Sequence, residues 1–304
     1  MKKSKIFASR EKLAGILFAL PMLLYAGVFL IAPVVLSLFF SFTKWNMRST
    51  PAWVGIDNYV NLLTDSVKYP YFWHSLKVTL TYSLLAVPMT IISGLVLALI
   101  INSIRKEKLE GFFKVAFYLP VITSSVAVAA IWKWVYDPMY GLLNTFLEAI
   151  GLKGFNWLGD SKIALFAVAI LAAWGCGGTM LIYLAGLKGI PDQLYESAKI
   201  DGASSFRQFF GITLPMLKPT TFFLVVTTTI GSFQVFDIVY VLYGAGGGSY
   251  GGPDNSLLTF TMYIYNHAFR YEQMGVACAM SFILFIIILI LTIVQFKFLP
   301  QRYD

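Results

Sequence analysis

Long apolar runs without a charge constrain this chain more than any other feature. A helix needs about 20 apolar residues to cross the hydrocarbon core of a bilayer, and the first run, Leu13 to Phe40, has 28 residues and no charge. Soluble proteins carry about 25% charged residues, whereas this sequence carries 12%. The sequence therefore predicts an all-α polytopic membrane protein. Its six predicted spans cover residues 13–40, 78–101, 115–136, 163–187, 220–243 and 275–296.

The loops between these spans are too short for a soluble domain, so we expect a single transmembrane domain over residues 1–304. Positive charge is unevenly shared between the two sides. Of the 23 Lys and Arg residues, 15 lie on the side that holds both termini. Because cytoplasmic loops are enriched in Lys and Arg, we predict that both termini are cytoplasmic. The net charge of +8 then reflects these loops and does not indicate nucleic-acid binding.

The predicted cytoplasmic loop 188–218 is more than a connector. Pro191 and Asp192 suit the first turn of a helix, and Gly202 is a natural stop for it. A second short helix is expected from about Ser205. Two short helices could form a compact knob that another protein grips, or they could lie on the lipid surface, and periodicity does not separate these alternatives.

The same loop carries a long motif. Its residues resemble the signature E-A-A-x-x-x-G-x9-I-x-L-P of the integral membrane subunits of binding-protein-dependent ABC importers. One position differs, since a serine stands where the second signature residue is usually alanine. The matching and adjoining residues are Glu196, Ser197, Ala198, Asp201, Gly202, Ile212, Leu214 and Pro215.

Other segments are similar to the carbohydrate branch of that family. They include Trp53–Tyr59, Trp134–Asn144 and Gly251–Pro253, and they look like the first permease half of the maltose and glycerol-phosphate type. The resemblance implies six transmembrane helices of the type I ABC importer permease kind. It also implies a second homologous permease subunit, two cytoplasmic ABC ATPase subunits and an extracytoplasmic sugar-binding protein. The helix Glu196–Gly202 would be the coupling helix seated on the ATPase.

Glycine-rich motifs for nucleotide binding give little support for a cofactor. The strip 244–253 contains a G-x-G-x-x-G match at Gly246–Gly251, but its flanks are predicted membrane helices rather than the strand and helix of a dinucleotide site. No G-x-x-x-x-G-K-[ST] occurs in the sequence. We expect no cofactor and no metal on this chain, with ATP and Mg on the partner ATPase.

Polar groups inside the spans are candidates for the substrate pathway. Asp237 is the one acid inside a predicted span, and Gln234 precedes it by three residues. An intramembrane carboxylate is costly and usually faces a cavity or a partner, although a hydrogen bond that merely holds the helices together is the alternative. Aromatic rings at Phe233 and Phe236 could stack on a sugar.

The fourth span contains three glycines within the run Trp174–Thr179. Glycines weaken a helix by about 1 kcal/mol each relative to alanine, so they favour either a break that exposes backbone to a cavity or close helix packing. The family resemblance implies that Trp174 and Thr179 line the pathway.

These features together predict the transmembrane subunit of an ATP-driven importer that moves a sugar, most simply a di- or oligosaccharide, into the cytoplasm by alternating access. The expected location is a bacterial or archaeal cell membrane, with membrane lipid around the spans. The alternative is a self-contained symporter that uses Asp237 as its proton or cation site. A membrane-embedded enzyme is not favoured, because no motif for covalent chemistry is present.

Overall fold

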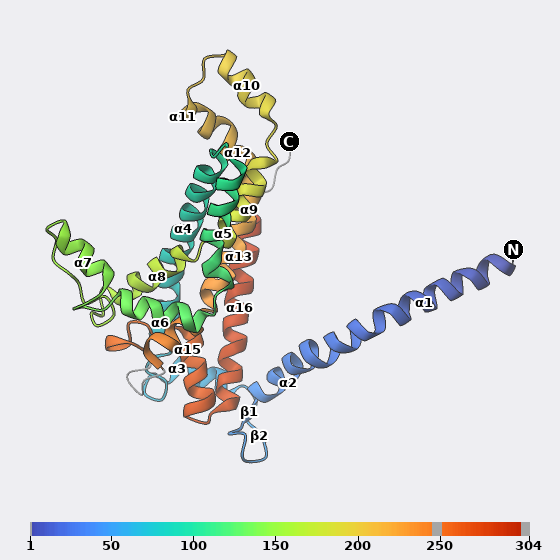
Figure 1. Cartoon of the computed structure of the whole chain (residues 1–304). Helices are drawn as coiled ribbons and strands as arrows, with labels where there is room; N and C mark the ends of the chain where they lie inside the picture. Colours follow the sequence, from blue (N-terminus) through green and yellow to red (C-terminus); the bar gives the residue numbers. More distant parts are fainter. Residues whose placement is uncertain (1, 245–250, 299–304) are drawn as a thin grey trace. The chain divides into compact units, whose positions relative to one another are not determined.

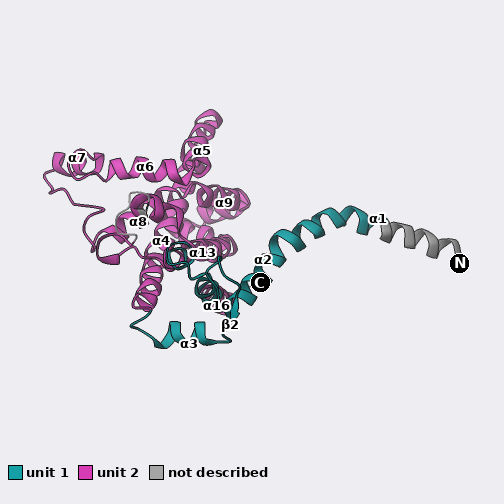
Figure 2. Ribbon diagram, turned by 90° about the horizontal axis from the view of Figure 1, so that it is seen from below, with its two compact units in different colours: residues 1–68, 264–283 teal, residues 69–263, 284–304 magenta. Residues whose placement is uncertain are grey.

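The computed structural model describes residues 2–244 and 251–298, and most of the glycine-rich strip 244–253 therefore falls outside the described residues. The described residues are mainly helical (Figure 1). They divide into two compact units, residues 1–68 with 264–283 and residues 69–263 with 284–304 (Figure 2). Helix α16, Met274–Phe298, contributes to both units.

The first unit begins with a long apolar helix. Helix α1 (Lys2–Ala26) continues through a π-helical segment (Gly27–Ile31) into α2 (Ala32–Ser41). A short antiparallel pair follows, in which β1 (Thr43–Lys44) pairs with β2 (Ala52–Trp53). Helix α3 (Asp57–Thr64), the π-helical segment Asn266–Arg270 and the first turns of α16 complete the unit.

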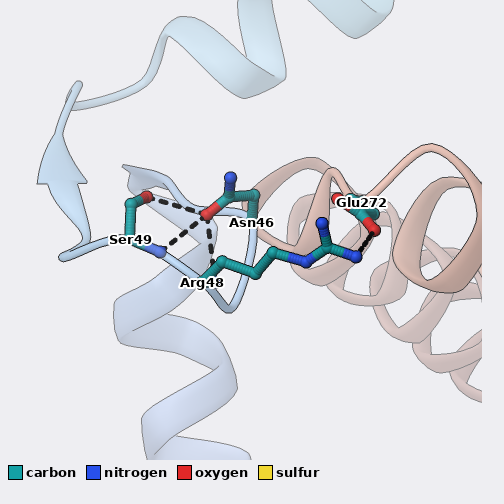
Figure 3. A network of polar contacts seen from close by, with 4 residues as sticks. All are labelled: Asn46, Arg48, Ser49 and Glu272. Atoms are coloured by element: carbon teal, nitrogen blue, oxygen red, sulfur yellow. Dashed lines mark hydrogen bonds and ion pairs between the residues drawn. The ribbon is translucent and has the colours of Figure 1, made fainter.

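Buried polar contacts hold the end of α2 within this unit. The Asn58 amide donates to the carbonyl oxygens of Ser41 and Thr43, at 2.8 and 2.9 Å. A side chain on Gly275 would collide with the Thr43 carbonyl oxygen, so glycine permits this close approach. The loop between β1 and β2 is fastened by an ion pair between Arg48 and Glu272, as Figure 3 shows.

The second unit is a helical bundle around α4 (Phe72–Asn102). Helices α8, α9 and α13 pack against α4, and polar bridges link it to the bundle, such as Ser83 to Ser232 at 2.7 Å between the side-chain oxygens. The other α-helices of the unit are α5 (Glu107–Ile122), α6 (Ser125–Val135), α7 (Leu142–Ala149), α8 (Ala164–Trp174), α9 (Gly177–Lys188), α10 (Asp192–Ile200), α11 (Ser205–Gln208), α12 (Leu214–Met216), α13 (Lys218–Phe233), α14 (Asp237–Val239) and α15 (Phe260–Tyr265), of which the last ends in the first unit.

Three described helices are long and apolar enough to span a membrane without a break, namely Ala14–Ser41, Phe72–Asn102 and Met274–Lys297. They agree with the first, second and sixth predicted spans, although the second begins six residues earlier than expected. Three further helix pairs qualify only as bent spans, α5 with α6 (100°), α8 with α9 (45°), and residues 205–216 with α13 (63°). Six spans are obtained when each bent pair is counted as one.

The prediction of a single continuous third span over residues 115–136 is wrong in one respect. Helix α5 ends at Ile122, and Thr123 and Ser124 adopt extended backbone with ψ of 142° and 133° before α6 begins. The Thr123 hydroxyl donates to the Leu119 carbonyl oxygen at 2.9 Å. This side-chain donor satisfies a carbonyl that the interrupted helix leaves without a backbone partner.

Candidate functional site

The predicted coupling loop forms a helical knob, residues 192–216, at one end of the second unit. In Figure 1, α10 and α11 project beyond the ends of α4 and α5. Helix α10 ends at Ile200 with Asp201 as its C-cap, and the predicted stop residue Gly202 follows with φ of +72°. The amide of Ala203 donates to the Ala198 carbonyl at 2.8 Å, and that of Gly202 to the Lys199 carbonyl at 3.1 Å. This is a Schellman motif, which reverses the chain at a residue with positive φ.

Side-chain hydrogen bonds close the knob behind this turn. The Gln208 amide donates to the Ala203 carbonyl at 2.9 Å. The Tyr195 and Thr213 hydroxyls lie 2.9 Å apart, which links α10 to the returning π-helical segment Phe209–Thr213. Tyr195 and Ile212 also pack against the buried cluster that contains Leu187 and Leu217. The knob is therefore a folded element anchored at its base.

The structure separates the predicted coupling residues into two groups. Ile212, Leu214 and Pro215 are half-buried at the base, and Ala198 is half-buried in α10. The exposed group lies toward the tip and consists of Glu196, Ser197, Asp201 and Gly202. The Ser197 hydroxyl donates to the Gln193 carbonyl at 2.8 Å, a bond within α10 that the usual alanine could not make.

Sequence reasoning missed the three most exposed of the large apolar side chains on this knob. Ile200 is 88% exposed, Phe206 73% and Phe210 51%. The Phe206 and Phe210 rings lie 4.6 Å apart between centroids. The available signal was the pair Phe206 and Phe210, whose rings are in contact, because neighbouring exposed apolar groups mark an interaction site or a lipid contact. We refer to Ile200, Phe206 and Phe210 as the tip patch.

The predicted pathway residues of the fifth span lie at a helix break. Helix α13 ends at Phe233, and the chain is non-helical until α14 begins at Asp237. The spacing of three residues would place Gln234 and Asp237 on one face of a continuous helix over the predicted span 220–243, and this arrangement is wrong because the break separates the two residues. Both side chains are nevertheless exposed, and Phe236 stacks on Tyr240 with ring centroids 5.2 Å apart.

Hydroxyl groups distant in the sequence satisfy the carbonyls freed by this break. Thr259 donates to the Val235 carbonyl at 3.2 Å, and Thr261 donates to the Phe233 carbonyl at 3.3 Å. An unpaired carbonyl in a membrane interior is costly, so these two bonds explain why the helix can end there. Phe233 itself is only 3% exposed, which places its ring in the protein interior.

The fourth span has both a helix break and close helix packing at its glycines. The helix breaks at Gly175–Cys176, between α8 and α9. Gly177 lies so close to α5 that a side chain would collide with the Phe117 carbonyl, which is close helix packing. Trp174, at the end of α8, is 45% exposed. Its ring meets the Trp132 ring edge-on with centroids 5.5 Å apart.

Thr179 is held against α4. A side chain built on Gly94 would lie 2.6 Å from the Thr179 methyl group, so the two helices approach closely at this point. That contact is typical of small residues at a helix–helix interface.

The described residues include no group of three or more His, Cys, Asp or Glu side chains that could hold a metal ion.

Comparisons with known proteins agree on one family. Residues 86–302 match the family described as "Binding-protein-dependent transport system inner membrane component". The chain is 37% identical to the probable ABC transporter permease protein YesP of Bacillus subtilis, over 98% of this chain and 93% of the relative. It is 35% identical to the trehalose/maltose transport system permease protein MalF of Thermococcus litoralis, over 97% and 96%.

A solved structure shares the fold. It is that of a bacterial alginate ABC transporter in complex with a periplasmic protein bound to an alginate pentasaccharide, and one of its chains matches with a TM-score of 0.80 and 25% identity over 96% of each chain. The family match covers more than half of this chain, and the curated relatives cover nearly all of it. The chain therefore belongs to the family of binding-protein-dependent transport system inner membrane components, and it is a multi-pass membrane protein.

Proposed function

We propose that this chain is the transmembrane permease subunit of an ATP-driven importer that moves a sugar, most simply a di- or oligosaccharide, into the cytoplasm. The observation that carries the proposal is the anchored knob 192–216 with its exposed tip patch, because it bears the importer signature on a folded element that projects from the bundle. The names of relatives support the sugar class, since one concerns trehalose and maltose and another lactose.

Two cytoplasmic ATPase subunits are the proposed partners of the knob. Apolar side chains such as Ile200 and Phe206 gain stability when a protein cleft removes them from water. Glu196 is exposed on α10, the helix that also carries Ile200, and it could pair with a basic residue in that cleft. Those subunits would bind ATP with Mg and would hydrolyse the ATP. This permease would bind no cofactor and perform no covalent chemistry.

A second homologous permease is the other proposed membrane partner. The apolar helix Ala14–Ser41 has no buried residue in its most apolar 18-residue window. Side chains such as Phe29 and Leu36 are more than half exposed, so lipid or another subunit must surround them. An extracytoplasmic sugar-binding protein would deliver the substrate, as a periplasmic protein bound to a pentasaccharide accompanies the similar alginate transporter.

The pathway would run beside the two helix breaks. Trp174, Gln234 and Asp237 are exposed next to backbone that is not helical, and Phe236 is half-buried beside them. Aromatic faces with amide and carboxylate groups suit the apolar and hydroxyl faces of a sugar. Phe233 and Thr179, which pack inside the protein, would support these breaks.

The proposed location is a bacterial or archaeal cell membrane with both termini in the cytoplasm, on the basis of the unequal distribution of Lys and Arg. In this arrangement the knob faces the ATPase. Closure of the ATPase subunits would move the knob, and the cavity would then open outward to receive the sugar.

The ATPase proposal is tested by purifying the tagged chain from its native membranes and measuring ATP hydrolysis in the eluate. Ile200→Glu and Phe206→Glu should each remove most of the hydrolysis, because a charge on the tip patch opposes burial. Phe146→Glu is the matched control, since Phe146 on α7 is 62% exposed and lies outside the knob. Equal hydrolysis in all four preparations would contradict the proposal.

The pathway proposal is tested separately by uptake of labelled maltose, trehalose and lactose in cells that lack the native chain. Asp237→Ala or Gln234→Ala should lower uptake or change its selectivity while the ATPase still co-purifies. A lost hydrogen bond to a sugar hydroxyl should cost about 0.5–1.5 kcal/mol. Unchanged uptake of every sugar in both variants would leave the pair with a structural role only.

A further inference from the structure

A cluster of three charges joins α5 to the point where the knob leaves the bundle. One carboxylate oxygen of Glu110 lies 2.6 Å from the Lys114 ammonium of its own helix and 2.6 Å from the Lys188 ammonium of α9. Lys188 is the last residue of α9, and α10 begins at Asp192. A displacement of α10 therefore reaches Lys188 after three intervening residues.

Helices α5 and α9 are also in contact at their other ends. Gly177, the first residue of α9, lies against the backbone of Phe117 and Tyr118, where a side chain would not fit. The two helices are thus connected both by close backbone packing and by the ion pair between Glu110 and Lys188. Two separated attachments oppose both sliding and rotation of one helix against the other.

Helix α5 leads directly to the pathway residues. The extended residues Thr123 and Ser124 join it to α6 at the 100° bend, and Trp132 of α6 contacts Trp174. A continuous route of bonded or packed groups therefore runs from α10 through Lys188, Glu110 and α5 to the ring of Trp174.

The charge pair itself contributes little to folding. The Lys188 side chain is 53% exposed and that of Glu110 15%, and ion pairs with an exposed partner usually add little stability because water screens them and two flexible side chains are immobilised. An exposed pair can still determine how two helices are aligned, since each alternative alignment loses the contact. The position of the pair between Glu110 and Lys188, rather than its contribution to stability, points to a role in keeping α5 and α9 aligned when one of them moves.

We propose that Glu110 is a positioning residue which, by holding Lys188, transmits movement of the knob into α5 and across the Thr123–Ser124 break to α6. The inference rests on the proposed function, because it assumes that a nucleotide-driven ATPase moves the knob.

The test uses the complex purified with its ATPase and a reporter cysteine, Ser124→Cys, at the exposed break. Cys176 and Cys278 are buried, so the protein without the reporter gives the background. The rate of labelling by a maleimide is measured with and without ATP and orthovanadate. We expect nucleotide to change the rate in the parent and in Lys114→Gln, which keeps the pair between the helices.

In Glu110→Gln and Lys188→Gln the change produced by nucleotide should fall roughly two- to fivefold, the factor that corresponds to an exposed ion pair. Exchanging the charges, Glu110→Lys with Lys188→Glu in the Lys114→Gln background, should restore it. Restoration by the exchanged charges would show that the contact between positions 110 and 188, and neither side chain alone, carries the nucleotide response.

Three results would overturn the inference while ATP hydrolysis shows that the ATPase is still attached. They are an unchanged nucleotide response in both single variants, no restoration by the exchanged pair, and no nucleotide response in the parent. Absence of ATP hydrolysis from the parent preparation would instead contradict the proposed function.

Discussion

The turn at Gly202 offers a direct test of how the knob is built. Gly202 has φ of +72°, and a Cβ added there would meet no heavy atom within 4 Å. A side chain at this position would therefore not obstruct any described part of the chain. The cost of a substitution lies in the backbone alone, since residues other than glycine pay roughly 1–2 kcal/mol in the left-handed region.

That cost predicts different outcomes for two substitutions of Gly202. Alanine should reduce the population of the native turn by roughly 5- to 30-fold relative to the competing conformations. Asparagine tolerates positive φ through local hydrogen bonding, so it should retain much of the native turn. Affinity is measured by titrating the solubilised permease with the purified ATPase subunit, and Gly202→Ala should weaken binding far more than Gly202→Asn.

Gly211→Ala is the matched control for this experiment. Gly211 is an exposed glycine of the same knob, it does not have positive φ, and a Cβ there would also meet nothing within 4 Å. Equal loss in Gly202→Ala and Gly202→Asn would refute the backbone argument and indicate that the ATPase contacts this position closely. Native affinity in both would show that the turn is not needed.

Asn144 is 3% exposed and accepts a hydrogen bond from the Trp157 indole at 2.8 Å, so Asn144→Ala should lower the free energy of unfolding by about 2–4 kcal/mol. Asn156 is exposed, so Asn156→Ala should change that free energy little. Equal thermal unfolding temperatures for the two variants would contradict this reasoning. A cysteine at Ser103 should resist an impermeant maleimide in whole cells while one at Ser249, outside the described residues, reacts, and the reverse pattern would overturn the predicted orientation. Burial lowers the pKa of His267 from its ordinary value of 6.5, so below that pH the unfolded chain binds a proton that the native state does not bind. The unfolding temperature should therefore fall as the pH drops below about 6.5. His267→Gln should weaken this dependence on pH.

Local sequence determined which segments are apolar and where the knob reverses. The apolar run from Leu13 to Phe40 lies within the helical stretch formed by α1, the π-helical segment and α2, and its C-terminal end was predicted within one residue of Ser41, because hydropathy is a property of each residue summed over a window. The stop at Gly202 was equally local, since only the residues on either side of it form the Schellman bonds. The family signature also depends on residues close together in the chain.

Tertiary structure decided where the apolar segments break and what their polar groups meet. Helix α13 ends at Phe233, where the hydroxyls of Thr259 and Thr261 donate to carbonyls in place of backbone amides. The ion pair between Glu110 and Lys188 joins residues that are 78 positions apart in the sequence. Hydropathy is the same for a continuous and a broken helix, so it predicted one span from 220 to 243. A helix can end inside a membrane only where other groups satisfy its free carbonyls, and at Phe233 those groups are distant in the sequence, so the folded chain alone brings them there.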